Sequence, residues 1–279
     1  MAEHHPEKLA APYAVNEGGG IPIEAAGTLT YLLGIGEKGR LQLEIEIKGT
    51  SAHASTPWQG TNALFGLSEV VKRIEVYEAE RDTSTSLFDH LSTFAIEDKP
   101  SPENIDQIIA DNEETQPRFA SIMKALSRMT ITPTMIQGGI KSNSVPESVR
   151  LTCDVRTLPH QDEAYVRKEL DRILDGIPGV EIEIDYMSIP NSSPFETDFA
   201  KRIQISTANA LQRDDIQWVP SLTTGFTDSR FTRNLGTTTY GMVGSHPDDD
   251  PMISFVHGTN ESVGIRSLIS GTRIMLALA

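Results

Sequence analysis

The sequence predicts an α/β (α+β) protein in which a ferredoxin-like unit is inserted into a larger α/β domain. Between residues 41 and 187, strand and helix patterns follow in the order βαββαβ, which is typical of a four-stranded antiparallel sheet with helices on one face. From residue 188 onward, helices and strands alternate as in an α/β domain. We therefore expect a first α/β segment at 1–40, the ferredoxin-like domain at 41–187 and a second α/β segment at 188–279.

The first half of the chain contains one clear strand and one clear helix. Residues 1–40 alternate glycines with short apolar runs, a pattern typical of loops. Apolar and polar residues alternate over 41–48, which predicts a half-buried strand, and the apolar stretch that follows predicts a helix at about 60–78. The polar residues at about 81–128 form an insertion into the ferredoxin-like unit, with two short helices of their own.

Alternating apolar residues predict the later strands, and capping and turn residues mark the ends of the second ferredoxin-like helix. Asp162 marks the start of the second ferredoxin-like helix, and Gly176 marks its end. The expected elements are strands at 129–137, 148–156 and 180–187 with a helix at 161–175, then a helix at about 195–211, strands at 217–222 and 237–243 and a helix at 260–277.

Composition limits the classes of function. With 279 residues and a net charge of −15, the chain should repel nucleic acid and anionic membranes, so we expect a small-molecule substrate. No apolar stretch approaches the length of a membrane span. The single cysteine, Cys153, excludes an intrachain disulfide and a cysteine-based zinc site, and it favours a cytoplasmic location.

The strongest chemical signal follows the first predicted strand. The segment Gly49-Thr-Ser-Ala-His53-Ala-Ser-Thr-Pro57 holds a histidine between a strand end and a helix start, among small residues that leave room for a ligand. An imidazole there can stabilise an oxyanion, transfer a proton or bind a metal. The alternative is a surface histidine in a polar loop.

Four further segments present polar groups at the ends of predicted elements. Glu17, beside three glycines, offers a carboxylate that suits zinc, although triple glycine also suits a flexible turn. Asn143 offers a two-sided hydrogen-bonding group, or it serves its own turn. Arg230 can clamp a carboxylate at a strand-to-helix junction where Asp228 can cap the helix. His257 precedes the last helix, where metal ligation and capping both remain open.

Two other charged clusters are interpreted as solvent-exposed. His246 and Asp248 have the spacing of a metal pair, but they lie in an acidic loop broken by proline. Glu113 and Glu114 fall in the polar insertion and are interpreted as part of a charged linker. Neither cluster is expected to take part in catalysis.

Taken in order, the motifs resemble the di-zinc metallopeptidase and amidohydrolase family of aminoacylase, acetylornithine deacetylase, succinyl-diaminopimelate desuccinylase and glutamate carboxypeptidase. In that family the ferredoxin-like unit is a dimerisation or lid domain, and the α/β part is a zinc-exopeptidase-like catalytic domain. The resemblance extends over nearly the whole chain. The matching motifs are Asn16-Glu17-Gly18-Gly19, Gly36-Glu37-Lys38-Gly39, Lys48-Gly49 with His53-Ala-Ser55-Thr-Pro57, Gly138-Gly139 with Asn143-Ser-Val-Pro146, Asp154-Val-Arg156, Thr227-Asp228-Ser229-Arg230 and His257-Gly-Thr-Asn-Glu261.

The resemblance implies metal-assisted hydrolysis of an amide bond. Glu17 would be a ligand to one of two zinc ions and His257 a ligand to the other, and cobalt or manganese could replace the zinc. His53 would reach the active site of the partner subunit in a homodimer and stabilise the oxyanion.

The resemblance also implies how a substrate is held. The substrate would be an N-acyl amino acid or a short peptide. Asn143 would hydrogen-bond this substrate, and Arg156 or Arg230 would hold its carboxylate.

The chain departs from the family pattern before Glu17. The family's His-x-Asp pair, its bridging aspartate and its paired glutamates, one of them the general base, have no counterpart there. We therefore expect the C-terminal part of a zinc-dependent amide or peptide hydrolase, inactive as this chain alone. The alternative is a non-catalytic dimerisation module that lacks the N-terminal metal-binding half.

Overall fold

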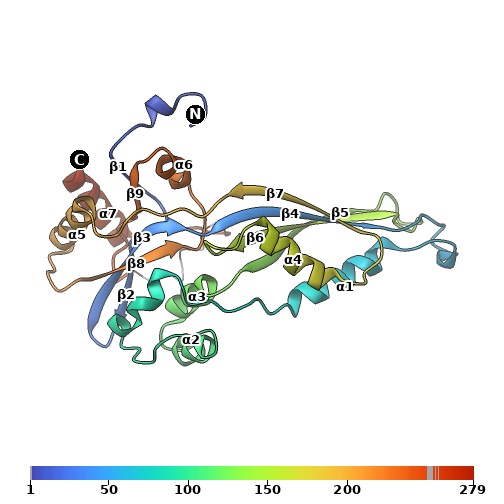
Figure 1. Cartoon of the computed structure of the whole chain (residues 1–279), viewed down its shortest axis with the longest axis horizontal. Helices are drawn as coiled ribbons and strands as arrows, with labels where there is room; N and C mark the ends of the chain where they lie inside the picture. The colour runs from blue at the N-terminus through green and yellow to red at the C-terminus, as the bar shows by residue number, and fades with distance from the viewer. Residues whose placement is uncertain (1, 250–253, 255, 257) are drawn as a thin grey trace. The chain divides into compact units, whose positions relative to one another are not determined.

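The computed structural model describes residues 2–249, 254, 256 and 258–279, which fall into two compact units (Figure 1). Unit 1 comprises Met1–Lys38, Arg81–Arg128 and Pro190–Ala279, and unit 2 comprises Gly39–Glu80 and Met129–Ile189. The segment Arg81–Arg128 interrupts unit 2 in the sequence, but its contacts make it part of unit 1.

Unit 2 is a ferredoxin-like sandwich, which confirms the fold predicted from the sequence. Its strands form an antiparallel sheet in the order β5-β6-β4-β7, and α1 and α4 cover one face (Figure 1). The elements are β4 (Gly39–Lys48), a short 3-10 helix η2 (Pro57–Gln59), α1 (Ala63–Glu75), β5 (Thr130–Gly138), β6 (Ser148–Thr157), α4 (Glu163–Leu174) and β7 (Val180–Ser188).

The alternation in the sequence of β4 produces the core of unit 2. Its apolar residues Leu41, Leu43, Ile45 and Ile47 are buried and belong to one cluster with apolar residues of α1 and α4. Cys153 on β6 is buried in the same cluster, and burial raises the pKa of its thiol to about 12. The thiol therefore serves packing rather than chemistry.

Side-chain caps set the starts of the unit 2 helices. The carboxamide of Asn62 accepts a backbone N–H at 3.0 Å at the start of α1, and the carboxylate of Asp162 accepts one at 2.9 Å at the start of α4. After α4 the chain turns at Gly176 and Gly179, both with φ of +72°. The predicted start and end signals of this helix are thus confirmed.

Unit 1 is an α/β domain in which a mixed sheet has helices on both faces (Figure 1). The strand order is β1-β9-β3-β2, with β8 also paired to β3; the pairs β1–β9 and β3–β8 are parallel. The elements are η1 (Pro6–Lys8), β1 (Tyr13–Asn16), β2 (Ile21–Ala25), β3 (Thr28–Glu37), η3 (Ser86–Phe94), α2 (Ile105–Glu113), α3 (Pro117–Leu126), α5 (Asp198–Leu211), β8 (Gln217–Thr223), α6 (Ser229–Asn234), β9 (Thr238–Gly241) and α7 (Ile265–Leu278).

The expectation of loops over residues 1–40 was wrong, because most of this segment forms strands. β2 and β3 make an antiparallel hairpin whose turn, Ala26-Gly27, has φ of 48° and 79°. Glycine inside β3 has a packing reason: a Cβ on Gly34 would lie 2.5 Å from the carbonyl oxygen of Gly18. Glycines that suggested loops therefore mark a close approach of backbones within a sheet.

Helices cover the two faces of the unit 1 sheet from different parts of the chain. Leu29, Tyr31 and Leu33 of β3 cluster with residues of α5 and α7. Leu32 belongs to the opposite cluster, with η3, α2 and α3 of the segment 81–128, because successive side chains along a strand point to opposite faces. Among the described residues, no helix has the length and apolarity needed to cross a membrane.

The last helix begins later than predicted. α7 starts at Ile265 rather than near residue 260. Gly264 stands at its N-cap without a side chain, and the carboxylate of Asp249 accepts the N–H of Ser267 at 2.7 Å. A distant aspartate therefore satisfies the first turn, which a local sequence pattern does not indicate.

Charged residues hold the ends of the unit 1 segments together. The buried ammonium of Lys38 donates to the carbonyl oxygens of Ala125 at 2.6 Å and Arg128 at 2.8 Å. Asp106 on α2 pairs with the guanidinium groups of both Arg81 and Arg128. These contacts anchor three of the points at which the chain passes between the two units.

A buried ion pair links β3 to α6. Glu37 is 1% exposed; its Oε2 accepts the N–H of Thr227 at 2.6 Å, and its Oε1 lies 3.7 Å from Nη1 of Arg233. Burial raises the pKa of Glu37, while the Thr227 hydrogen bonds and the Arg233 charge oppose the rise. Each charge of such a pair depends on the other once both are removed from water.

Replacing Arg233 by methionine should lower the free energy of unfolding by about 3–5 kcal/mol, because the Glu37 carboxylate would stay buried without a counterion. The double variant Glu37→Gln/Arg233→Met should regain part of this loss. Denaturant titration followed by tryptophan fluorescence measures both. Arg202→Met, at an exposed site on α5, is the control and should change stability by less than about 0.5 kcal/mol. An Arg233→Met effect as small as the control's would show that the ion pair does not stabilise unit 1.

Candidate active site

A cavity of about 530 Å³ in unit 1 lies where three strands end. Glu17–Gly19 follow β1, Thr223 ends β8 and Thr224–Thr227 follow it, and Val243 lies just after β9; all of them line the cavity. In α/β folds ligands commonly bind beyond the carboxyl ends of strands. This cavity is therefore the candidate active site of unit 1.

Glu17 presents a carboxylate to this cavity. Its side chain is exposed and is not engaged by any residue that the structure describes. The preceding Asn16 accepts the Glu17 N–H at 2.9 Å and donates to Ser229 Oγ at 3.2 Å, which ties the end of β1 to α6. Gly18 and Gly20 have φ of +90° and +69°, so the triple glycine is a defined turn that exposes Glu17.

Arg230 belongs to the segment that follows β8. Its Nη1 donates to the carbonyl oxygen of Thr227 at 2.7 Å, and its guanidinium lies 4.4 Å and 4.2 Å from the ring centroids of Phe226 and Phe231. Asp228 occupies the N-cap position of α6, but its side chain makes no capping hydrogen bond. The rings and Thr227 therefore fix the direction of the guanidinium.

His53 and Asn143 are neighbours in unit 2, although they are far apart in the sequence. The N–H of Ala54 donates to the Asn143 carbonyl oxygen at 3.0 Å, and His53 forms an isolated bridge with Ser144. His53 is exposed, and its Nδ1 lies 2.7 Å from Ser55 Oγ. The side chains of His53 and Asn143 thus project from two adjoining loops.

Arg156 lies on β6 and already binds a carboxylate. Its Nε donates to Asp154 Oδ1 at 2.5 Å, and Nε of Arg40 donates to Asp154 Oδ2 at 2.8 Å. Burial alone would raise the pKa of Asp154, but the hydrogen bonds and charges of the two arginines outweigh it and lower the pKa. Arg156 is therefore part of a three-residue ionic cluster on the sheet.

The predicted metal ligands do not form a complete site in the described part of the chain. His257 lies outside the described residues, so only Glu17 of the predicted pair has a described position. No three His, Cys, Asp or Glu side chains converge on a possible metal position within residues 2–249, 254, 256 and 258–279. Zinc needs three or four protein ligands, so the described residues alone do not fit the metal.

The pair His246 and Asp248 is engaged locally. Nδ1 of His246 accepts the N–H of Asp248 at 3.2 Å, and the exposed Asp248 carboxylate pairs with Arg266 at 3.0 Å. The Asp248 carboxylate is exposed as expected, whereas the His246 ring is half-buried.

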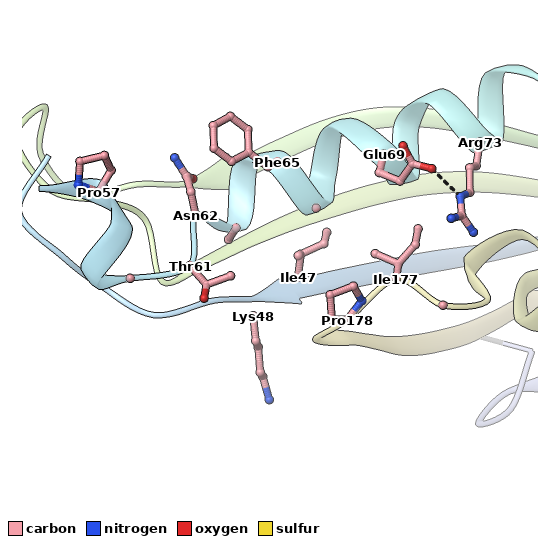
Figure 2. A pocket seen from close by; sticks show the side chains of 14 residues that line it. Ile47, Lys48, Pro57, Thr61, Asn62, Phe65, Glu69, Arg73, Ile177 and Pro178 are labelled. Atoms are coloured by element: carbon pink, nitrogen blue, oxygen red, sulfur yellow. Dashed lines mark hydrogen bonds and ion pairs between the residues drawn. The ribbon is translucent and has the colours of Figure 1, made fainter.

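A second hollow lies in unit 2 between α1 and the connection from α4 to β7 (Figure 2). Ile47, Ile177 and Pro178 lie on one side of α1, whereas Phe65 points away from the sheet and is 77% exposed (Figure 2). The ion pair between Glu69 and Arg73, 2.8 Å long, borders it. This mostly apolar surface is suited to contact with another molecule rather than to hydrolysis.

One charged residue at the Glu17 cavity was missed from the sequence. Arg118, at the start of α3, lines the cavity together with Ile122, one helical turn later. The segment 81–128 was interpreted as a polar insertion, so none of its charges was considered for the site. The i, i+4 spacing of Arg118 and Ile122 on a short helix was the available signal.

Residues 35–179 match the family model of the M20 peptidase dimerisation domain. The match covers more than half of the chain and includes the region from β4 to α4, with its His53 and Asn143 loops. The chain belongs to the M20 peptidase family.

Curated relatives agree with this assignment. The chain is 23% identical over 263 residues to human N-fatty-acyl-amino acid synthase/hydrolase PM20D1, a match that covers 88% of this chain and 50% of that protein. It is 24% identical over 274 residues to carboxypeptidase S of Saccharomyces cerevisiae, with 84% and 47% covered. The chain thus spans about half the length of these relatives.

Solved structures show the same fold. The dipeptidase Dug1p of Saccharomyces cerevisiae has a TM-score of 0.64 at 14% identity, with 99% of this chain and 61% of that chain covered. Human carnosine dipeptidase 1 has a TM-score of 0.63 at 13% identity, with 100% and 62% covered. At these identities the likeness concerns the fold alone.

The Asp154→Asn variant should lose about 1–3 kcal/mol of stability at neutral pH, because Arg40 and Arg156 would lose their charged partner. The folded-state pKa of Asp154 is depressed, so this stabilisation is present above the ordinary pKa of about 3.9 and disappears as pH falls through the folded-state value. Unfolding curves between pH 7 and pH 2 should therefore converge for wild type and variant. Asp171→Asn, exposed on α4, should show no such convergence.

Proposed function

We propose that this chain forms part of a metal-dependent hydrolase that cleaves the amide bond of N-acyl amino acids or short peptides. The observation that supports this most directly is the unengaged carboxylate of Glu17 at a cavity beyond the strand ends, in a chain of the M20 peptidase family. Two relatives carry the names of a carboxypeptidase and an N-fatty-acyl-amino acid synthase/hydrolase, which supports the same reaction type.

The metal in this proposal is a pair of zinc ions, or cobalt or manganese in their place. Glu17 would be a ligand to one ion and His257 to the other. The remaining ligands and the general base would have to come from outside the described residues. When bound, metal of this kind polarises the scissile carbonyl and activates water.

His53 and Asn143 hold the reacting amide in this proposal. Because Nδ1 of His53 lies against Ser55 Oγ, Nε2 is the ring nitrogen that can donate to an oxyanion in the partner subunit's site. The Asn143 carboxamide has no partner among the described residues, so it can hydrogen-bond substrate. The contacts of Arg156 with Asp154 favour Arg230 as the group that holds the substrate carboxylate.

The proposed partners and location follow from charge and cysteine content. A net charge of −15 disfavours nucleic acid and anionic membranes and leaves a small-molecule substrate. The single, buried Cys153 fits a cytoplasmic location.

The second candidate is a non-catalytic dimerisation module. It is favoured by the incomplete metal set in the described residues. With such a set, we expect the isolated chain to hydrolyse no N-acyl amino acid or dipeptide. The presence of the family's His-x-Asp pair and paired glutamates in the same polypeptide, or in a partner polypeptide, distinguishes the two candidates.

We further propose that unit 2 mediates a homodimer through β5 and α1. β5 is an edge strand whose unpaired backbone groups need cover. Exposed apolar side chains lie on both elements: Leu64 and Phe65 on α1, and Met135 and Ile136 on β5. A two-fold contact would close the edge and bury these side chains at once.

In an assembled enzyme that contains this chain and a complete metal set, His53→Ala should lower turnover by about 10²–10³-fold without loss of metal, because it removes an oxyanion donor. Glu17→Ala should lower the metal content as well as turnover. Metal analysis and steady-state kinetics distinguish these effects.

Mixing the two inactive variants tests the action of His53 across the dimer. Each mixed dimer holds one site with an intact Glu17 that faces an intact His53, so part of the activity should return. Absence of recovery after verified subunit exchange would contradict this role of His53.

Phe65→Lys should shift the protein from dimer to monomer at micromolar concentration, because it places a charge within the apolar contact on α1. Light scattering coupled to size exclusion measures the mass directly. Ile205→Lys, which replaces an equally apolar exposed residue on α5 of unit 1, is the control and should remain dimeric. A monomeric wild-type protein would contradict the proposed interface.

A further inference from the structure

Arg118 is a cation in the Glu17 cavity that the proposed function leaves unused. It occupies the second position of α3, on the same helix face as Ile122, and both residues line the cavity. Of the described residues that line it, Arg118 is the only basic one and Glu17 the only acidic one. The two charges enter from different parts of the chain, Arg118 on α3 and Glu17 after β1.

Arg118 has no partner among the described residues, although it is half-buried. No hydrogen bond, ion pair or ring contact joins its guanidinium to another residue that the structure describes. Burial lowers the pKa of Arg118, and no nearby carboxylate counters this. Removing a guanidinium from water without a counterion is unfavourable, so an anion supplied from outside would stabilise it.

The other shielded arginines of unit 1 provide a contrast. Arg128 pairs with Asp106, Arg233 lies beside Glu37, and Arg230 donates to the Thr227 carbonyl oxygen. Each of these guanidinium groups has a partner within the fold. Arg118 makes no such structural contact and faces a cavity, which is the placement of a ligand-binding residue.

The rest of the cavity lining defines the ligand that suits it. Ile21, Leu32, Ile122 and Leu222 make much of the lining apolar, with the hydroxyl of Thr224 among the polar groups. An apolar chain fits these walls, and one guanidinium matches a single planar monoanion. A carboxylate meets this requirement by bidentate pairing, whereas a doubly charged phosphate would need further cations.

We propose that Arg118 binds the carboxylate at the end of a short apolar chain, so that the Glu17 cavity is a subsite for acidic, partly apolar groups. This rests on the proposed function for two elements, namely that Glu17 marks the position of the reacting amide and that Arg230 holds the first carboxylate. The preferred substrates are then amides whose acyl group or side chain ends in a second carboxylate. Arg230 holds the first carboxylate, and Arg118 determines specificity through the second.

Binding of hexanoate and of its uncharged analogue hexanamide to the metal-free 279-residue chain tests the subsite. We expect hexanoate to bind about tenfold more tightly than hexanamide, the difference that one charged hydrogen-bonded contact provides. Arg118→Gln should abolish this preference. Arg202→Gln, with the same change of charge at an exposed site on α5, should retain it. Titrations followed by ¹⁵N NMR measure the affinities and report whether each variant is folded.

Two further measurements distinguish a loss of carboxylate binding from a loss of folding. Arg118→Lys keeps the charge but not the fork of donors, so its preference should be intermediate even if the glutamine variant does not fold. In the wild-type protein, hexanoate should shift the amide signals of Thr223–Thr227.

Equal affinity for the two ligands in the wild-type chain would overturn the proposal. Such a result would show that Arg118 does not recognise a carboxylate in this cavity. Because neither probe needs metal or turnover, this result would leave the proposed hydrolase intact. Conversely, a failure to find hydrolysis would leave a measured hexanoate preference intact.

Discussion

The close approach of the Gly18-Gly19 turn, which follows β1, to glycines of β3 and β9 is the constraint on which unit 1 depends. A Cβ on Gly34 or on Gly241 would lie 2.5 Å from the carbonyl oxygen of Gly18, and one on Gly19 would collide with the carbonyl oxygen of Gly241. Any larger residue at these positions would force the strands apart. The same contact sets the floor of the cavity, because Glu17 leaves β1 at this point and the segment after β8 meets Gly18 through Thr223.

Most of unit 2 was predictable from the sequence because its signals are local. β4 alternates strictly, and the sheet buries one of its faces under α1 and α4. Asp162 and Gly176 bound α4 by the capping and turn chemistry of the segment itself. The βαββαβ order of the elements then predicts the ferredoxin-like arrangement.

The features that escaped prediction depend on partners distant in the chain. Gly34 of β3 resembles a loop glycine until the backbone of Gly18 is placed against it. The segment 81–128 appears polar, yet its helices cover one face of the unit 1 sheet. The neighbourhood of His53 and Asn143 depends on a bridge between two loops of unit 2. Arg118 was not predicted as a site residue, because only the folded chain shows that it lines a cavity.

The burial of Cys153 makes the reactivity of its thiol a measure of the opening of unit 2. Its thiol is enclosed in the core and is almost entirely protonated near neutral pH, so alkylating reagents cannot reach a reactive thiolate while the sandwich is closed. With one cysteine in the chain, every labelled molecule has opened at that core. The rate of Cys153 modification therefore measures how often the unit 2 core opens, separately from any unfolding of unit 1. No probe has to be introduced for this measurement.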